Sequence, residues 1–275
     1  MALSRVGMGF LGLFFMASAI LLIFLTLLGG ARNSNPLNRI YFLQANTANI
    51  PGAPPLSRWT FWALCSVKNG LNDCGTSHPD FPLDPPSHRN FNTTVNVPHQ
   101  FIGTNHYFLT SRFMFPFIII GLFFATLALF TGLLALCTRI GSYISGFLSW
   151  LALTFQAITT CLMTYVPSLP SHVLFRLIHD TNHWVKSAVF VQGRNAFNRN
   201  GQTAKLGVKA FAFMWTATAC LFLSCLLYCL GGAVGRKDAG YSGREQRRRG
   251  FFSSARSNSV RSQSGANKKE TTSYA

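Results

Sequence analysis

The stretch Trp59-Thr-Phe-Trp62-Ala-Leu-Cys65, followed by a second cysteine at Cys74, decides the fold class of this chain. Both cysteines lie in a polar segment that follows a long apolar run. Eight residues between two cysteines suit a short disulfide clip, which stabilises a loop by about 2–3 kcal/mol in the chain-entropy picture. Such a bond persists in an oxidising compartment, so we expect this loop to face away from the cytosol.

The composition indicates a membrane protein. Of 275 residues, 49% are hydrophobic, only 11% are charged, and 26 are phenylalanine. A bilayer is the natural solvent for so much apolar and aromatic surface. Four stretches are long enough to cross about 30 Å of hydrocarbon as helices. We expect spans at residues 6–28, 113–136, 143–166 and 210–230, loops at 29–112, 137–142 and 167–209, and a tail at 231–275.

The spans contain no Asp, Glu, Lys or Arg, and each can satisfy its backbone hydrogen bonds internally as a helix. Pro116 is expected in the first turn of the second span, where its missing donor does little harm. The first span also has features of a cleaved signal peptide, because Gly29-Gly30-Ala31 offers small residues for cleavage. Its apolar length exceeds the usual 7–15 residues of such a signal, which favours retention.

Charges in the short connections set the expected orientation. Arg5 precedes the first span, Arg139 lies in the short connection, and Arg236 follows the last span. These positions predict that the connection and both termini are cytoplasmic. The two long loops are then extracellular, in agreement with the cysteine pair. The acceptor Asn92-Thr93-Thr94 lies in the first of these loops, so Asn92 is a candidate glycosylation site.

These residues resemble a known family. The pattern Trp-x2-Trp-x2-Cys-x8-Cys in the first outer loop of a four-span chain is similar to the claudin-like superfamily, and the nearer resemblance is to the fungal Sur-seven/PalI family. The narrower resemblance rests on the last span and on Trp59, Trp62, Cys65, Cys74, Gly75, Pro79, Phe81, Pro82, Asp84 and Pro85. It implies an all-α membrane protein: a four-transmembrane-helix bundle with a small disulfide-clipped extracellular β-sheet, built mostly from the first outer loop.

The resemblance also implies a function. Members of the family organise a stable lateral domain of the plasma membrane, of the eisosome type, with effects on cell-wall organisation and endocytosis. The implied partners are the lipid bilayer and other cortical membrane proteins, in a homo- or hetero-oligomer, and no nucleic acid. The alternative is an accessory subunit of an ambient-pH sensing complex. It draws on the outer-loop histidines, whose side chains titrate near neutral pH: His78, His88, His99, His106, His172, His179 and His183.

Enzyme chemistry finds little support in the sequence. No phosphate-cradling glycine loop with a lysine and no carboxylate pair occurs. His179 and His183 are spaced for one helical face, but no third metal ligand accompanies them. A transporter or channel is disfavoured because the spans are poor in polar groups, with Gln156 as the main exception. We therefore expect no catalytic residue, no cofactor and no metal. For Trp59 and Trp62 we expect a structural role, and the alternative is binding of a neighbouring protein or of the cell wall.

The tail has a separate character. Ten Lys and Arg against three acids give residues 231–275 a net charge of +7, and the segment is too poor in apolar residues to fold. Two interpretations stay open: binding to anionic inner-leaflet lipid through Arg244, Arg247, Arg248 and Arg249, or simple topology control. Phosphorylation would oppose lipid binding at a predicted cluster of serines: Ser253, Ser254, Ser257, Ser259, Ser262 and Ser264.

Overall fold

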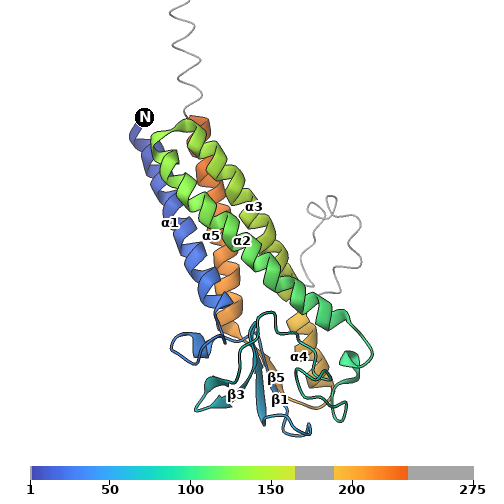
Figure 1. Ribbon diagram of the computed structural model, residues 1–275. Coiled ribbons are helices and arrows are strands. Elements are labelled where there is room, and N and C mark those ends of the chain that lie inside the picture. The colour runs from blue at the N-terminus through green and yellow to red at the C-terminus, as the bar shows by residue number, and fades with distance from the viewer. Residues whose placement is uncertain (1, 165–188, 235–275) are drawn as a thin grey trace, which may run out of the picture.

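The structure is a computed structural model that describes residues 2–164 and 189–234. Figure 1 shows a bundle of long helices with a small sheet and a short helix at one end. The bundle consists of α1 (Ala2–Leu27), α2 (His106–Cys137), α3 (Arg139–Met163) and α5 (Val208–Val234). Four stretches of these described helices are long and apolar enough to span a membrane: Val6–Leu27, His106–Leu136, Ile140–Met163 and Val208–Gly232. The predicted four-helix membrane fold is confirmed.

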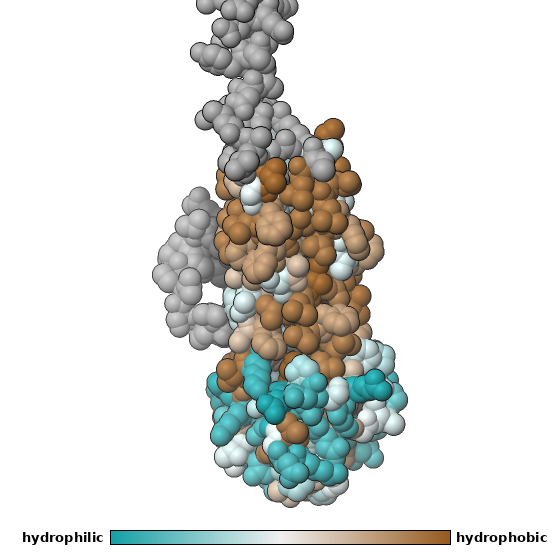
Figure 2. Space-filling model, turned by 90° about the vertical axis from the view of Figure 1, so that its left-hand side faces the viewer, coloured by the Kyte–Doolittle hydropathy of each residue, from teal (hydrophilic) through white to brown (hydrophobic). Residues whose placement is uncertain are grey.

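Each helix of the bundle packs on two others: α1 packs on α2 and α5, and α3 packs on the same two helices. Its outer surface is apolar, as the brown band above the teal head in Figure 2 shows. Large side chains point outward there, including Phe10, Phe14, Phe123, Phe130, Phe147 and Trp150. Lipid tails solvate such a surface, whereas water would not. The start of α1 and the end of α5 lie together at the end opposite the sheet (Figure 1).

Helix α2 corrects the expectation for Pro116, which lies inside the helix and not in its first turn. The helix begins at His106 because its first turns, which mix polar and aromatic residues, pack on the head. Tyr107 is buried there, and the Ser111 hydroxyl accepts a hydrogen bond of 3.0 Å from the Leu83 amide. The connection to α3 is also shorter than 137–142. Thr138 alone separates the two helices, and its hydroxyl accepts from the Gly141 amide.

The buried face of α3 is polar, which corrects the expectation that Gln156 is the main polar group of the spans. The stripe follows helical spacing: Ser142, Ser145, Ser149, Gln156, Thr159 and Thr160. Three of its hydroxyls bond across the bundle, to the Tyr228 carbonyl at 2.7 Å, to Thr131 at 3.0 Å and to Thr218 at 3.1 Å. Such bonds and small side chains hold helices together where no hydrophobic effect acts between them.

We expect Gly132→Ala to loosen the bundle. A Cβ at Gly132 would lie 2.4 Å from the Tyr228 hydroxyl oxygen and 2.8 Å from Leu13 Cδ2. Overpacking of this kind costs about 1–3 kcal/mol. Thermal unfolding in detergent, followed by size-exclusion chromatography, should show a lower midpoint for Gly132→Ala and partial recovery in the Gly132→Ala/Tyr228→Phe double variant. Gly7→Ala is the control, because nothing lies within 4 Å of its Cβ position. Equal midpoints for the two single variants would contradict the packing argument.

The head contains a five-stranded antiparallel sheet in the order β4-β3-β2-β1-β5. The strands are β1 (Leu43–Asn46), β2 (Leu56–Trp59), β3 (Leu64–Lys68), β4 (Leu71–Cys74) and β5 (Ala204–Leu206). The first four come from the first long loop, as the family resemblance implied. The fifth comes from the second long loop and pairs with β1, with Gln44 opposite Lys205. The sheet therefore joins the two loops.

Helix α4 (Val189–Arg199) covers one face of the sheet. Its buried residues recur at helical spacing: Val189, Phe190, Gly193, Ala196 and Phe197. The Phe190 ring stacks on Phe42 with centroids 4.9 Å apart. This helix lies in the segment 167–209, for which a loop was expected. Its eleven residues are too short for a span, and with a single apolar face they are polar on average. The head thus has its own hydrophobic core, which continues into the bundle.

Candidate functional site

The hairpin β3–β4 carries the cysteine pair. Cys65 and Cys74 lie directly opposite each other in the strand register and form a disulfide. The turn between the strands uses Asn69 and Gly70, both with positive φ, of 52° and 75°. Two-residue hairpin turns of that kind favour Asn-Gly because both residues tolerate the left-handed conformation. The turn and the disulfide therefore specify the same register.

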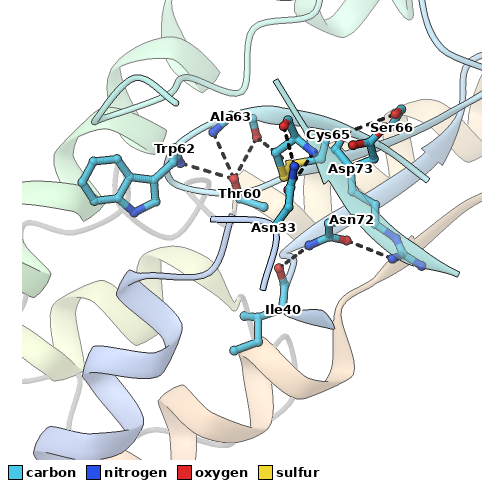
Figure 3. The surroundings of a disulfide bond; sticks show 11 residues. Asn33, Ile40, Thr60, Trp62, Ala63, Cys65, Ser66, Asn72 and Asp73 are labelled. Carbon is cyan, nitrogen blue, oxygen red and sulfur yellow. Dashed lines mark hydrogen bonds between the residues drawn. A yellow bond between two sulfur atoms is a disulfide. The ribbon is translucent and has the colours of Figure 1, made fainter. Parts of the chain in front are cut away.

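Side chains from distant segments anchor this hairpin, as Figure 3 shows. The Asn33 amide donates to the Cys74 carbonyl at 2.9 Å and accepts from the Cys74 amide at 3.0 Å, so it takes the place of a further strand at the edge. On the same strand, Asn72 donates to the Ile40 carbonyl at 2.9 Å and accepts from Arg58 at 2.9 Å. The segment after α1 is thereby held on the disulfide side of the sheet.

We expect the double variant Cys65→Ser/Cys74→Ser to lower stability by about 2–3 kcal/mol, the low end of the usual range for a lost disulfide. The reason is that the turn and the Asn33 bonds keep the register without it. Thermal unfolding of the purified protein, with and without reductant, measures the change. Cys220→Ser is the control, because Cys220 is a free cysteine in the structure.

Alkylation of the unfolded wild type without reductant gives an independent check on the same bond. Cys65 and Cys74 should be protected while Cys220 reacts. Modification of all three would show that no disulfide forms.

Both tryptophans of the motif have fixed partners. Trp59 is 1% exposed, and its indole donates to Asn90 Oδ1 at 2.9 Å. Its ring packs edge-on against Phe91 at 5.9 Å between centroids. The Trp62 indole donates to the Leu27 carbonyl at 2.6 Å, which lies in the last turn of α1, where helix carbonyls lack internal partners. Trp59 therefore builds the core of the head, and Trp62 joins the head to the bundle.

The tract after Cys74 folds back beside the motif. The His78 amide donates to the Trp62 carbonyl at 2.8 Å, and the Phe81 amide donates to the Phe61 carbonyl at 2.9 Å. The Pro82 carbonyl accepts from the Asn90 side chain at 3.3 Å, which links this tract to Trp59 through Asn90. The proline-rich tract is therefore a structural support for the tryptophans.

Two further motif residues, Asp84 and Pro85, complete this support. The Pro85 carbonyl accepts from the Phe91 amide at 3.1 Å. Burial raises the pKa of Asp84, against smaller opposing effects of Ser87 and His88. Gly75, by contrast, has no positive φ and open space around its Cβ position. Pro85 and Asp84 therefore have a structural role in this tract. Nothing in the surroundings of residue 75 requires glycine there.

A cleft of about 710 Å³ lies between this tract and the hairpin. Gly75, Pro79 and Phe81 line it together with four cationic or titratable side chains: His78, His88, Arg89 and Arg112. Asp80 pairs with Arg112 at 2.5 Å. His78 and His88 thus share one cleft. His99 lies in the short helix His99–Phe101 and His106 lies at the start of α2. Arg89 and the two histidines suit the binding of an anionic group, whereas Arg112 is already paired with Asp80.

The remaining predicted sites are partly outside the described residues. Asn92 is exposed on the head, with φ of 54°, and its glycosylation stays a prediction. The arginines and serines of the tail, from Arg244 to Ser264, and the pair His179 and His183 lie outside the described ranges. Within residues 2–164 and 189–234, no group of three or more His, Cys, Asp or Glu side chains is placed to hold a metal ion.

Several residues of the site escaped the sequence analysis. Asn33, Asn90 and Arg58 are polar residues in loops or strands, and no local pattern marks their partners. Arg58 adjoins Trp59 in the motif, and a cation inside a short strand of largely buried residues was the available signal. Phe197 was not predicted as a core residue, because a loop was expected where α4 lies. Each of these residues acts on a segment far from it in the sequence.

Comparison with known proteins places the chain among fungal membrane proteins. The profile of the SUR7/PalI family matches residues 8–176 and 184–227. The chain is 33% identical over 246 residues to Protein SUR7 of Candida albicans, covering 89% of this chain and 81% of the relative. It is 31% identical over 232 residues to SUR7 family protein FMP45 of Saccharomyces cerevisiae, covering 83% and 67%. It is 26% identical to the uncharacterized plasma membrane protein YNL194C of the same yeast, covering 79% and 65%.

Proposed function

Because this chain belongs to the SUR7/PalI family, we propose that it is a non-enzymatic, multi-pass plasma-membrane protein that organises a stable lateral domain of the eisosome type. Effects on cell-wall organisation and endocytosis follow from such a domain. The plasma-membrane location draws support from the relative that is named a plasma membrane protein. The head faces the cell exterior in this proposal, and both termini are cytoplasmic.

The observation that carries the proposal is the division of the surface into two parts. An apolar belt of exposed aromatic side chains surrounds the bundle, while a compact polar head covers one end (Figure 2). The head is held to the bundle through Trp62 and α1 and through the joint of β5 and α5. Head and bundle share one hydrophobic core, so the chain presents its lipid-facing belt and its polar head as one unit. It is therefore suited to lateral assembly with copies of itself or with other cortical membrane proteins.

Live-cell imaging of a fluorescently tagged chain tests the proposal. We expect immobile cortical patches that recover slowly after photobleaching. The matched variants are Phe123→Ala/Phe130→Ala, on the exposed face of α2, and Phe42→Ala as a destabilised control. The first should reach the plasma membrane but spread evenly, whereas the second should be retained in the secretory pathway because Phe42 is 1% exposed. Uniform wild-type fluorescence would contradict the domain-organising role.

The tail adds a lipid-binding element to the proposal. Arg244, Arg247, Arg248 and Arg249 would bind anionic lipid of the inner leaflet, with about 1 kcal/mol from each basic residue near the surface. Phosphate on the serine cluster from Ser253 to Ser264 would weaken that binding. Vesicles containing phosphatidylserine should retain the tail peptide, and glutamate at those serines should release it. Normal patches after deletion of residues 244–275 would leave topology control as the role of the tail.

One observation favours a second candidate, the accessory subunit of an ambient-pH sensing complex. His78 and His88 line the same cleft as Arg89, so protonation of both imidazoles would add positive charge beside an existing cation. The variant His78→Gln/His88→Gln should then abolish the response of the cell to external pH, while His99→Gln, outside the cleft, should leave it intact. An unchanged response in the double variant excludes this candidate.

A further inference from the structure

A second cavity, of about 460 Å³, lies where the sheet meets the start of α5. Three cationic side chains line it, and they come from three separate segments. Arg39 ends the short helix Leu37–Arg39, Arg58 lies in β2, and Lys209 lies in the first turn of α5. None of the described residues that line this cavity is acidic. The fold therefore gathers three positive charges around one space.

Arg58 is held in a fixed position within this cavity wall. Its side chain is 8% exposed. Its Nε donates to Gln44 Oε1 at 2.8 Å, and its Nη1 donates to the Gly70 carbonyl at 3.0 Å and to Asn72 Oδ1 at 2.9 Å. Its Cζ lies 4.2 Å from the centroid of the Tyr41 ring. All three acceptors are neutral, and Nη2 donates to no atom in the described part of the chain.

The charge of Arg58 is thus positioned but not neutralised. Burial of an unpaired cation is costly, so such a group is normally paired with an anion. The described carboxylates that form ion pairs do so elsewhere, Asp73 with Lys68 and Asp80 with Arg112. Burial lowers the pKa of Arg58, but a guanidinium remains charged at neutral pH. Among the described residues, no carboxylate neutralises Arg58, so its Nη2 is available to an anion.

Arg39 and Lys209 are available to the same anion. Both side chains are exposed, and neither forms an ion pair within residues 2–164 and 189–234. Lys209 also belongs to the helix turn whose free amides point toward the cavity end of α5, where an anion is favoured. Two flexible cations and one fixed guanidinium suit an oxyanion with several acceptor oxygens.

The position of the cavity at the start of the α5 span indicates the source of the anion. The apolar span of α5 begins at Val208, and Val208 is 77% exposed. Lys209, one residue further, lines the cavity. The cavity therefore opens at the boundary between hydrocarbon and water, which is the level of lipid head groups. A phosphate carried by a lipid reaches this position without leaving the bilayer.

We propose that Arg39, Arg58 and Lys209 bind the phosphate group of a phospholipid, in the leaflet on the same side as the sheet. Arg58 supplies the fixed donor Nη2, and Arg39 and Lys209 close on the remaining oxygens. The lipid would then be a stoichiometric component of the protein and not only its solvent. The inference is independent of the lateral-domain role, because binding is measured on the purified chain.

The test uses the full-length protein in neutral detergent and three probes: a short-chain phosphatidylinositol, the matching diacylglycerol without phosphate, and sodium phosphate. Native mass spectrometry counts bound lipid, and thermal unfolding gives the apparent Kd. We expect one phosphatidylinositol per chain and no binding of diacylglycerol. The double variant Arg39→Gln/Lys209→Gln should raise the apparent Kd for phosphatidylinositol at least about tenfold, since it removes two charge-assisted contacts. These side chains make no described hydrogen bond, so the fold should persist.

The matched control is Arg32→Gln/Arg199→Gln, which removes the same charge from exposed residues that do not line the cavity. It should bind the lipid as the wild type does. Equal weakening in both double variants would show a general effect of charge and overturn the site. So would unchanged binding in Arg39→Gln/Lys209→Gln, or equal binding of diacylglycerol. A further outcome would overturn the lipid source. If sodium phosphate stabilised the wild type but not Arg39→Gln/Lys209→Gln, while both proteins bound the lipid equally, the site would be one for soluble phosphate.

Discussion

Gly207→Ala is expected to abolish accumulation of the folded protein. Gly207 connects β5 to α5, and a Cβ at this position would lie 1.7 Å from the Tyr41 carbonyl oxygen and 2.6 Å from its carbonyl carbon. Both are backbone atoms, so no rotamer change relieves the clash. Relief requires β5 to move away from the chain at residues 41–42, where the Gly207 amide now donates to the Phe42 carbonyl at 2.9 Å. We expect the free energy of unfolding to fall by more than about 4 kcal/mol, a loss that single substitutions cause only through severe steric or packing defects.

The measurement for Gly207→Ala is the fraction of tagged protein that reaches the cell surface and elutes as a single species from size-exclusion chromatography. The matched control is Gly75→Ala in the same head, where nothing lies within 4 Å of the Cβ position. It should behave as the wild type. If Gly207→Ala reached the cell surface at the wild-type level and eluted as a single species, β5 would not be joined to the chain at Tyr41 as described.

Trp59→Ala should be the next most damaging change, with a cost of about 3–5 kcal/mol. The ring fills the space between the sheet and α4, where it contacts Phe197 at 5.5 Å between centroids. Trp59→Phe should fall between the wild type and alanine, because it keeps much of the apolar ring but leaves Asn90 Oδ1 without its indole donor.

Thermal unfolding of the detergent-purified protein ranks these variants. Trp150→Ala is the control, since Trp150 is 54% exposed on the lipid-facing side of α3; it should change the midpoint little. A similar loss for Trp59→Ala and Trp150→Ala would contradict the burial of Trp59. A role of Trp59 in direct contact with a partner is also unsuited to its 1% exposure, which leaves the exterior of the head to other residues.

Much of the membrane architecture was predictable from the chain alone. A bilayer demands about 20 apolar residues per helix and tolerates no unpaired backbone, so span number follows from composition over a window. The boundaries followed less well. His106–Arg112 mixes polar and aromatic residues, and it is helical because Tyr107 is buried on the head and Ser111 accepts a hydrogen bond from it. The polar stripe of α3 was hidden because Ser and Thr bond within a helix and are common in spans.

In the head, too, some features follow from the sequence and others only from the tertiary structure. The sequence by itself determined the disulfide pair and the membrane character of the bundle, because the first depends on residues close together in the chain and the second on average composition. Tertiary structure alone decided that β5 pairs with β1, and that Arg39, Arg58 and Lys209 line one cavity. The physical reason is that those contacts join segments far apart in sequence, and their choice depends on packing and on buried charge that no local pattern encodes.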